Sequence, residues 1–273
     1  AGAKQSYTIE AMMADTKALQ SGTSHNLGQN FAKAFEIEYL DRNNEQQFAW
    51  TTSWGLSTRF IGAIIMTHGD DQGLIMPPRL APIQIVIVPI FRSEDEQGIV
   101  MTCVNEIVKL LSKFRVKVDD RENLTPGFKF NDWELRGVPL RIEIGPRDVA
   151  NNTVVAAQRD IPGKAGKLFL IIDNLDMQIE KILNDIHNRM LDKATKFRDS
   201  HIFEPKDYED FKQIVSNGWA YAYWCGDPAC EDAIKQETKA TTRCRDLHQQ
   251  KSDGKCIYCE KPAHYKTYFA RAY

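Results

Sequence analysis

The chain has 273 residues, of which 42% are hydrophobic and 26% charged, and these ordinary values exclude a predominantly disordered protein. Its length suits two or three domains of roughly 100–150 residues each. The formal charge is −2 at pH 7, so the chain as a whole is no polycation and contact with nucleic acid requires a local basic patch.

Three further features narrow the class of protein. The longest apolar run, Ile85–Phe91, is far shorter than the ~20 residues that cross a bilayer. No basic-then-apolar signal peptide opens the chain. Six cysteines are too few for a disulfide scaffold, and five of them follow residue 224. These features predict a cytoplasmic protein with no membrane partner.

Residues 1–82 form the first predicted segment, which is rich in Gly, Ser, Thr and aromatic residues. We expect a strand at Ser6–Met13, a polar turn region at Gln20–Gly28 and a further strand at Phe31–Leu40. The stretch 76–82 contains three prolines, which cannot lie inside a helix or a central strand, and it therefore predicts a linker.

The next segment alternates strands and helices. A β-branched run at Ile83–Ile90 is typical of a buried strand. Ser93 and the three acids after it favour a helix start, because acids stabilise the positive end of the helix dipole. Further strands are expected at Val116–Val118, Leu140–Ile144, Thr153–Ala157 and Lys167–Ile172. The succession predicts an α/β domain with a mainly parallel sheet, followed by an amphipathic helix at 174–199 that joins two domains.

The cysteine spacing near the end of the chain predicts a metal site. One pair has four residues between its cysteines and the other has two, so together they can surround one tetrahedral Zn²⁺. The expected ligands are Cys225, Cys230, Cys256 and Cys259. Because four thiolates leave no open coordination position, we expect a structural zinc. The alternatives are two unrelated reduced pairs, or a ligand supplied by His248 or His264, while Cys244 is expected to be a bystander.

The run Thr52–Gly62 places a Gly-x-x-x-Arg pattern, Gly55 to Arg59, among hydroxyl residues. Arginine is a permanent bidentate donor to phosphate oxygens, and Ser and Thr hydroxyls add neutral hydrogen bonds. The run therefore fits a phosphate-binding site. The alternative is a strand-to-helix junction that carries a surface arginine.

Several strings taken together resemble the class II prolyl-tRNA synthetases, and among them the archaeal/eukaryotic-type group. They are Thr23–Phe31, Thr52–Gly62, His68–Pro82, Trp133–Pro139, the cysteine pairs and the ending Tyr268–Tyr273. The resemblance runs in order along the whole chain. It implies the C-terminal portion of such a synthetase, with the first and second class-defining motifs upstream, so this portion alone is expected to be incomplete for catalysis.

The resemblance also implies the fold and the function. Residues 1–82 correspond to the C-terminal part of an antiparallel-sheet catalytic domain, 83–190 to an α/β anticodon-binding domain with a mixed sheet and its joining helix, and 191–273 to a small α+β zinc-binding domain. The implied activity is ATP-dependent formation of prolyl-adenylate from L-proline and transfer to the 3′ end of tRNA(Pro). Mg²⁺ would accompany ATP, and the enzyme would be a homodimer through its catalytic domain.

Site residues follow from matching positions in the family. Arg59 matches the arginine of the third class II motif, which binds ATP phosphates, and is the expected catalytic residue. The other positions expected to hold ATP are Gln20, Thr23 and Ser57, and those expected to line the proline pocket are His25, Trp54 and Gly55.

The middle segment carries a basic excess that is independent of the resemblance. Residues 109–167 contain twelve Lys and Arg against eight Asp and Glu, a local charge of +4. Phosphate contacts need such an excess, and base edges need carboxylates and arginines. For the two adjacent guanines of a proline anticodon, the candidates are Glu134, Arg141 and Asp148, followed by Arg121 and Lys164. Each could equally form a surface or sheet ion pair.

Two other functions remain open at this point. A non-catalytic tRNA-binding module would keep the anticodon and zinc domains without activity. A free zinc-ribbon nucleic-acid binder would explain only the last segment. The joint presence of Gln20, Thr23, His25 and Arg59 favours the ligase, because a retired active site has no use for them together.

Overall fold

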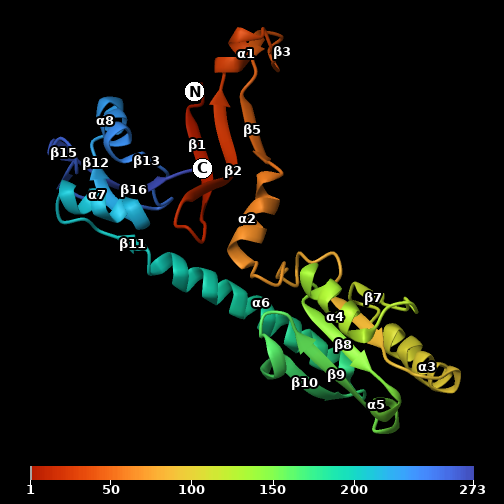
Figure 1. The fold of residues 1–273 in the computed structure, drawn as a ribbon. Helices are drawn as coiled ribbons and strands as arrows, with labels where there is room; N and C mark the ends of the chain where they lie inside the picture. Colours follow the sequence, from red (N-terminus) through yellow and green to blue (C-terminus); the bar gives the residue numbers. More distant parts are fainter. Residues whose placement is uncertain (1) are drawn as a thin grey trace. The chain divides into compact units, whose positions relative to one another are not determined.

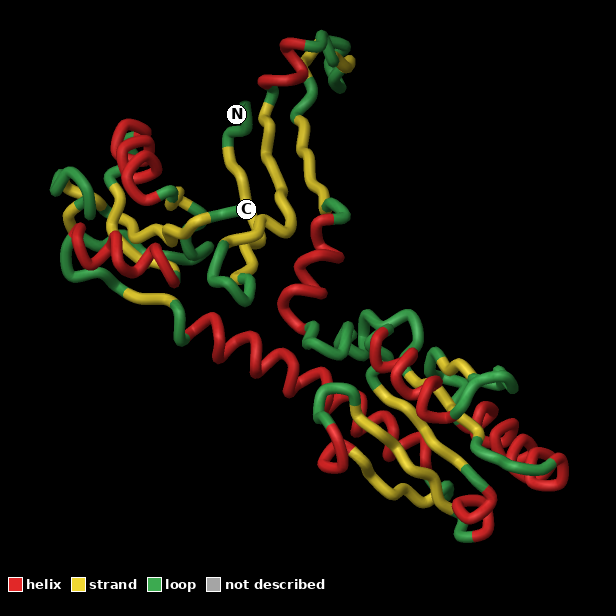
Figure 2. Tube along the Cα trace, viewed as in Figure 1, coloured by secondary structure: helices red, strands yellow, loops and turns green. Residues whose placement is uncertain are grey.

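The structure, a computed structural model, describes residues 2–273 and separates into two compact units. The first unit contains Ala1–Met66 and Phe197–Tyr273, and the second contains Thr67–Lys196. Figure 1 labels the elements of both units, and Figure 2 shows that each is built from sheets with accompanying helices. Within residues 2–273, no helix is at once long enough and apolar enough to span a bilayer.

The first unit begins with a three-stranded antiparallel sheet whose central strand is β2. Its strands are β1 (Gln5–Met12), β2 (Ala18–Gly28) and β5 (Thr51–Leu56). Between β2 and β5 lie α1 (Asn30–Ala34) and the hairpin of β3 (Glu38–Leu40) and β4 (Gln46–Phe48). Helix α2 (Arg59–His68) follows β5 after only two residues.

Two sequence-based expectations for this region are wrong. Gln20–Gly28 is no turn but most of strand β2, because both neighbouring strands hydrogen-bond to its backbone whatever the polarity of its side chains. The expected strand at Phe31–Leu40 instead begins with the short helix α1, and Phe31 stacks on Phe35, the residue that ends this helix. Only its last three residues, Glu38–Leu40, pair as β3.

The remainder of the first unit is a sheet covered on one face by two helices. The strand order is β11 (Ile202–Phe203), β12 (Trp219–Trp224), β16 (Tyr265–Arg271) and β13 (Ala240–Thr242). Helices α7 (Tyr208–Asn217) and α8 (Pro228–Thr238) bury Phe211 and Ile234 against Phe269 of the sheet. The hairpin β14 (Gly254–Lys255) and β15 (Pro262–Ala263) carries the second cysteine pair.

Three contacts tie this helix-covered sheet to the hairpin of β1 and β2 within the same unit. The Trp219 ring N–H donates to the carbonyl oxygen of Thr16 at 2.8 Å. Arg243 donates two hydrogen bonds to the buried carboxylate of Glu10, the shorter at 2.7 Å. The hydroxyl of the last residue, Tyr273, donates to Asp15 at 2.7 Å. Residues more than 200 positions apart in sequence thereby form one body.

The second unit is a five-stranded mixed sheet with the order β10, β9, β8, β6, β7. Its elements in chain order are β6 (Ile85–Pro89), α3 (Glu94–Leu110), β7 (Val116–Val118), α4 (Pro126–Leu135), β8 (Leu140–Ile144), α5 (Pro146–Ala150), β9 (Thr153–Gln158), the 3₁₀ turn η1 (Gly163–Gly166), β10 (Lys167–Ile171) and α6 (Leu175–Asp199).

The strands of this sheet do not all run in one direction. Strand β6 is parallel to β7 and β8, whereas β9 is antiparallel to β8 and β10. The expectation of a mainly parallel sheet is therefore wrong, and the mixed sheet implied by the resemblance is confirmed. The connection from β8 to β9 is too short for a crossover, so the chain turns back.

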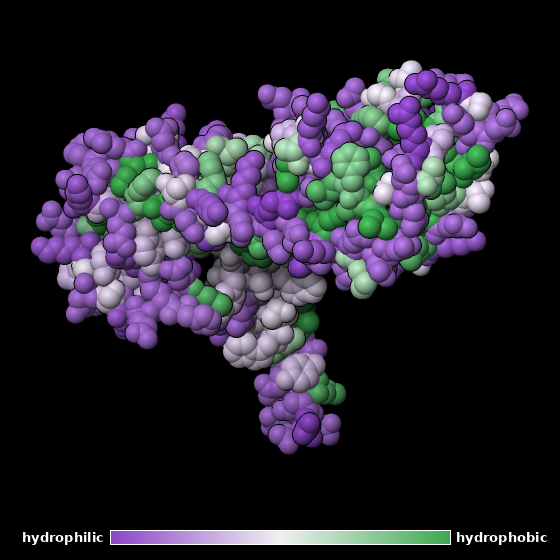
Figure 3. Space-filling view, turned by 90° about the horizontal axis from the view of Figure 1, so that it is seen from below, coloured by the Kyte–Doolittle hydropathy of each residue, from purple (hydrophilic) through white to green (hydrophobic). Residues whose placement is uncertain are grey.

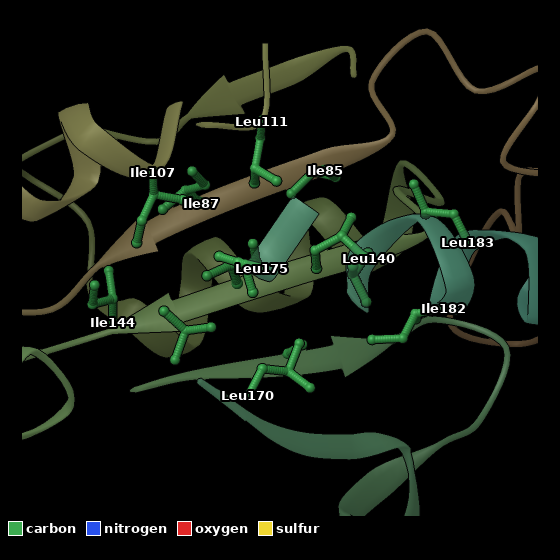
Figure 4. Close-up of a cluster of buried hydrophobic side chains, with 14 of the residues drawn as sticks. Ile85, Ile87, Ile107, Leu111, Leu140, Ile144, Leu170, Leu175, Ile182 and Leu183 are labelled. Atoms are coloured by element: carbon green, nitrogen blue, oxygen red, sulfur yellow. The ribbon is translucent and has the colours of Figure 1, made fainter. Parts of the chain in front are cut away.

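The core of the second unit lies on one face of this sheet. Ile107 of α3, Leu111 directly after this helix, and Leu175 and Ile182 of α6 pack against Ile85, Ile87, Leu140 and Ile144, all buried (Figure 4). On the opposite face α4 packs over β6 through Trp133. The expected helix start at Ser93 is confirmed, since its hydroxyl accepts from the Glu96 N–H and caps α3.

Candidate functional site

A surface hollow of about 350 Å³ lies on the first sheet, where β2 and β5 run side by side. It is lined by all seven residues that the sequence analysis assigned to ATP and proline: Gln20, Thr23, His25, Trp54, Gly55, Ser57 and Arg59. The pairing of the strands explains this gathering, because Thr23 lies opposite Gly55 and His25 opposite Ser53. Strand register thus joins two sequence segments about 30 residues apart into one lining.

Arg59 occupies the first position of α2, directly after the two-residue turn that ends β5. A cation at this end of a helix opposes the helix dipole, so the position gives no local benefit to folding. Among residues 2–273 no carboxylate forms an ion pair with Arg59. A free guanidinium beside the first N–H groups of a helix is suited to an anion such as a phosphate.

The other lining side chains supply mainly neutral hydrogen-bonding groups. The Nδ1 atom of His25 lies 2.8 Å from the hydroxyl of Ser6 on β1, which holds the ring in place. The amide of Gln20 donates to Thr8 at 3.4 Å. Trp54 lines the hollow but lies opposite Ser24 in the strand register, so its ring, 79% exposed, projects on the other face of the sheet from Thr23 and His25. The hollow therefore combines one cation, hydroxyls, an amide and an imidazole.

In the second unit, Glu134 and Arg141 belong to one charged network. Arg141 of β8 donates to Glu134 of α4 at 2.7 Å, and its guanidinium also bonds Glu143. Lys167 donates to Glu143 at 2.9 and 3.0 Å, and Arg141 lies over the ring of Phe130, 4.1 Å from its centroid. Arg141 is buried, whereas one third of the Glu134 side chain is exposed.

Asp148, the third anticodon candidate, lies elsewhere. It is in α5, beyond the far end of β8, and its carboxylate accepts from the backbone N–H of Gly145 at 2.8 Å. Arg121 is held by Asp119 and Asp132, and Lys164 lies exposed in the turn before β10. Of the five candidates, the structure brings only Glu134 and Arg141 into contact.

The sequence analysis missed several residues of this network. Glu143 could have been predicted as a partner of Arg141, because residues two apart on a strand project from the same face. Arg159 had no such signal. It is buried, donates to both carboxylate oxygens of Asp70 at 2.5 and 2.8 Å, and also donates to the carbonyl oxygen of Glu134 at 3.0 Å. These hydrogen bonds lower the pKa of Asp70 below its ordinary value.

The four predicted cysteine ligands converge at the end of β12. Their sulfur atoms all lie within 4.8 Å of one another, and Cys225 lies 3.7 Å from both Cys230 and Cys259. Sulfurs bound at ~2.3 Å to a tetrahedral Zn²⁺ lie ~3.8 Å apart, so the cluster fits a metal ion. Cys244 is outside the cluster, and burial raises the pKa of its thiol to about 11.

The turns around the cluster need glycine. A Cβ on Gly254 would lie 2.5 Å from the ring of Tyr223, and Gly226 has a φ of +83° in the left-handed region. Gly226 lies inside the first cysteine pair and Gly254 lies two residues before the second, so the backbone at both pairs is shaped by glycine.

Comparisons with known proteins cover all of these sites. Residues 1–68 match the family model "tRNA synthetase class II core domain (G, H, P, S and T)", residues 84–168 "Anticodon binding domain", and residues 208–273 "Prolyl-tRNA synthetase, C-terminal". The chain is 53% identical over 273 residues to a protein named proline–tRNA ligase from Chloroflexus aurantiacus. It is 49% identical over 279 residues to the chloroplastic/mitochondrial proline–tRNA ligase of Arabidopsis thaliana.

Both alignments include the whole of this chain, which covers 57% of the Chloroflexus protein and 51% of the Arabidopsis protein. The chain thus spans about half the length of the curated relatives it matches. The three family models follow one another along the chain in the same order as the hollow, the charged network and the cysteine cluster. The chain belongs to the class II prolyl-tRNA synthetases and is a C-terminal portion of such an enzyme, with a remnant of the class II core, an anticodon-binding domain and the C-terminal domain of the family.

Proposed function

We propose that the whole protein is a proline–tRNA ligase. The observation that carries this proposal is the gathering of Gln20, Thr23, His25 and Arg59 in one hollow of a chain half identical to proline–tRNA ligases. The first substrates would be L-proline and ATP with its Mg²⁺, and the last would be tRNA(Pro). The functional segments we propose are 1–82 for catalysis, 83–190 for the anticodon and 191–273 for the metal.

In the first reaction a carboxylate oxygen of proline attacks the α-phosphorus of ATP, and pyrophosphate leaves. Arg59 would neutralise phosphate charge, while Gln20, Thr23 and Ser57 would orient ATP through neutral hydrogen bonds. His25, Trp54 and Gly55 would form the proline pocket. In the second reaction a ribose hydroxyl of the tRNA attacks the activated carbonyl, and AMP leaves. Such chemistry depends on positioning and charge neutralisation more than on a side-chain nucleophile.

The test is proline-dependent exchange of pyrophosphate into ATP, using protein expressed with whatever its gene encodes before Ala1. Removing one contact that strengthens in the transition state costs about 10²–10³ in rate, so Arg59→Ala should lower exchange by that factor. Arg42→Ala, an exposed arginine in the hairpin of β3 and β4, is the matched control and should exchange normally. His25→Ala should raise the KM for proline more than the KM for ATP.

Wild-type exchange in Arg59→Ala would remove this residue from the ATP site. Wild-type protein that binds tRNA(Pro) but never exchanges pyrophosphate would favour the non-catalytic tRNA-binding module instead.

For the anticodon we propose that Glu134 and Arg141 read guanine and that Asp148 contributes from its separate position. Glu134 keeps one carboxylate oxygen outside its bond to Arg141 and can accept from a guanine edge. Of the five N–H groups of Arg141, three donate to Glu134 and Glu143 among the described residues. The other two could donate to a base. The basic excess of residues 109–167 supports phosphate contacts around this pair.

For the cysteine cluster we propose a structural zinc. The sulfur spacing and the all-thiolate donor set favour Zn²⁺ over Mg²⁺ or Ca²⁺, which prefer oxygen. The metal would stabilise the C-terminal domain and leaves no position for a substrate. We also propose that the whole enzyme works in the cytoplasm as a homodimer through its catalytic domain, as the family resemblance implies.

A further inference from the structure

The face of the second sheet that carries α4 is covered only in part. Helix α4 packs over β6 through Trp133, whereas on that face the side chains of β9 are only partly buried and those of β10 are exposed. Phe169 of β10 is 80% exposed and Ile171 is 56% exposed, while Leu168 and Leu170, which alternate with them along the strand, point into the core on the other face. Figure 3 shows exposed hydrophobic surface, in green, among the hydrophilic side chains of this unit.

The strand register places Phe169 in line with the charged network. Glu143 of β8 lies opposite Val155 of β9, and Val155 lies opposite Phe169 of β10. One rung away, Arg141, Ala157 and Lys167 form the neighbouring row. Because side chains two residues apart share a face, both rows project on the side of α4. We call these two rows the open sheet face.

The chemistry of the open sheet face suits an unpaired RNA base. Phe169 offers a ring with nearly all of its surface free, and the short side chains of Val155 and Ala157 leave room beside it. Lys167 keeps 37% of its side chain exposed and supplies positive charge next to the ring. Unpaired bases stack on exposed aromatic rings, and lysines contact the phosphates that join them.

We propose that Phe169 is a base-stacking residue that extends the anticodon interface across the open sheet face. It would hold a nucleotide next to those read by Glu134 and Arg141, and it would add affinity without reading sequence, because every base has a π face. This inference rests on the proposed reading of the anticodon by the Glu134–Arg141 pair. The alternative is that another protein binds the open sheet face. Such a partner would require an apolar side chain at position 169 but not an aromatic ring.

The experiment measures binding of an RNA hairpin that reproduces the anticodon arm of a proline tRNA to the full 273-residue chain. Phe169→Ala should weaken binding about 5- to 150-fold, the range expected for one lost base–aromatic stack. Phe169→Tyr keeps the ring and should bind within about 2-fold of wild type. Phe169→Leu keeps apolar character but loses the ring, and should bind nearly as weakly as Phe169→Ala. Because the side chain is exposed, none of these variants should affect folding.

Two controls make the result specific. Ile99→Ala removes a 56% exposed apolar side chain from α3, on the opposite face of the sheet, and should leave binding unchanged. Hairpins with one abasic loop nucleotide at a time should identify a position where wild type and Phe169→Ala bind equally.

The inference is overturned if Phe169→Ala binds like wild type while Glu134→Ala binds weakly, and the proposed anticodon site then stands without it. Wild-type binding by Phe169→Leu would also overturn it and point to a protein partner. Failure of the wild-type chain to bind the hairpin at all would remove both proposals.

Discussion

At the scale of single residues, Asp119 is the polar group that anchors α4 to the sheet of the second unit. Its carboxylate, almost fully buried, accepts from Arg121 at 2.7 and 2.8 Å and from the ring N–H of Trp133 at 2.7 Å, and its carbonyl accepts from Lys129. Burial alone would raise the pKa of Asp119, but the hydrogen bonds from Arg121 and Trp133 outweigh it and lower the pKa to about 2. The charged form is therefore the one that the fold stabilises.

This depressed pKa predicts a loss of stability in acid. A carboxyl with a pKa near 4 when unfolded and about 2 when folded contributes about 2 kcal/mol above pH 4, and that contribution disappears as the pH falls towards 2. Asp119→Asn should lower the free energy of unfolding at pH 7 by at least this amount and flatten its decline between pH 4 and 2. Urea unfolding at several pH values measures both effects. Asp120→Asn, an exposed neighbour, should behave as wild type, and equal curves for all three proteins would contradict the assignment.

The Glu134–Arg141 pair gives a second prediction at this scale. Glu134→Ala and Arg141→Ala should each cost ~1–3 kcal/mol of discrimination between cognate tRNA and tRNA with a changed anticodon. Proline-dependent pyrophosphate exchange should stay nearly intact, because it needs no tRNA. Lys164→Ala, in the exposed turn before β10, should instead weaken all tRNAs alike and reduce the salt dependence. An unchanged anticodon preference in both variants would exclude this pair as the reader.

At the scale of elements, the segment that follows α2 is strapped onto the end of α4. Leu74 N–H donates to Leu135 at 3.0 Å and Met76 N–H to Gly137 at 3.1 Å. The two backbones approach so closely that a Cβ on Gly73 would lie 2.6 Å from the backbone of Leu135. Gly73 also has a φ of +130°, which other residues rarely adopt. Leu135 follows Glu134 of the charged network directly in sequence, so these hydrogen bonds help to position Glu134.

Gly73→Ala should therefore destabilise the second unit, by about 1–3 kcal/mol for the backbone strain and more if the two segments must separate. Gly98→Ala is the matched control, because a Cβ at this position inside α3 meets nothing within 4 Å. That change should stabilise by about 0.5–1 kcal/mol, since alanine favours the helix. Thermal unfolding of the two variants beside wild type measures the contrast, and a harmless Gly73→Ala would disprove the close approach.

At the scale of the whole molecule, each of the two units has its own hydrophobic core. The core of the second lies under α3 and α6, and the first combines the small cores around Phe211 and Trp219. The cysteine cluster belongs to the first unit alone. A change confined to the cluster should consequently act on one unit and spare the other.

Removal of the proposed zinc tests this separation. A chelator should release one Zn²⁺ per chain and lower the stability of residues 197–273 by several kcal/mol, as for other structural zinc sites. Hydrogen exchange should accelerate in β12 and β16 and stay unchanged in β6 and β8. Cys230→Ser should mimic the chelator, whereas Cys244→Ser, outside the cluster, should keep its metal. The absence of zinc in wild-type protein by elemental analysis would refute the proposal.

Local patterns accounted for much of this molecule. The helix start at Ser93, the strands Ile85–Pro89 and Leu140–Ile144 and the converging cysteines follow from capping chemistry, β-branched runs and ligand spacing. For the segment around Arg59 the sequence left two alternatives, a phosphate site or a strand-to-helix junction with a surface arginine. The structure places Arg59 at such a junction, as the first residue of α2. The polar stretch Gln20–Gly28 has the side chains of a turn, but its position between two strands makes it a strand.

The sequence by itself determined the family, the cysteine set and the residues of the hollow, because these depend on residue type and on spacing along the chain. Only the tertiary structure decided that Arg159 joins Asp70 to the backbone of Glu134, that Asp148 lies apart from Arg141, and that Phe169 shares a sheet face with Glu143 and Arg141. The physical reason is strand order and register. A contact between residues far apart in sequence exists only once neighbouring strands have paired, and pairing depends on the whole core, not on any local pattern.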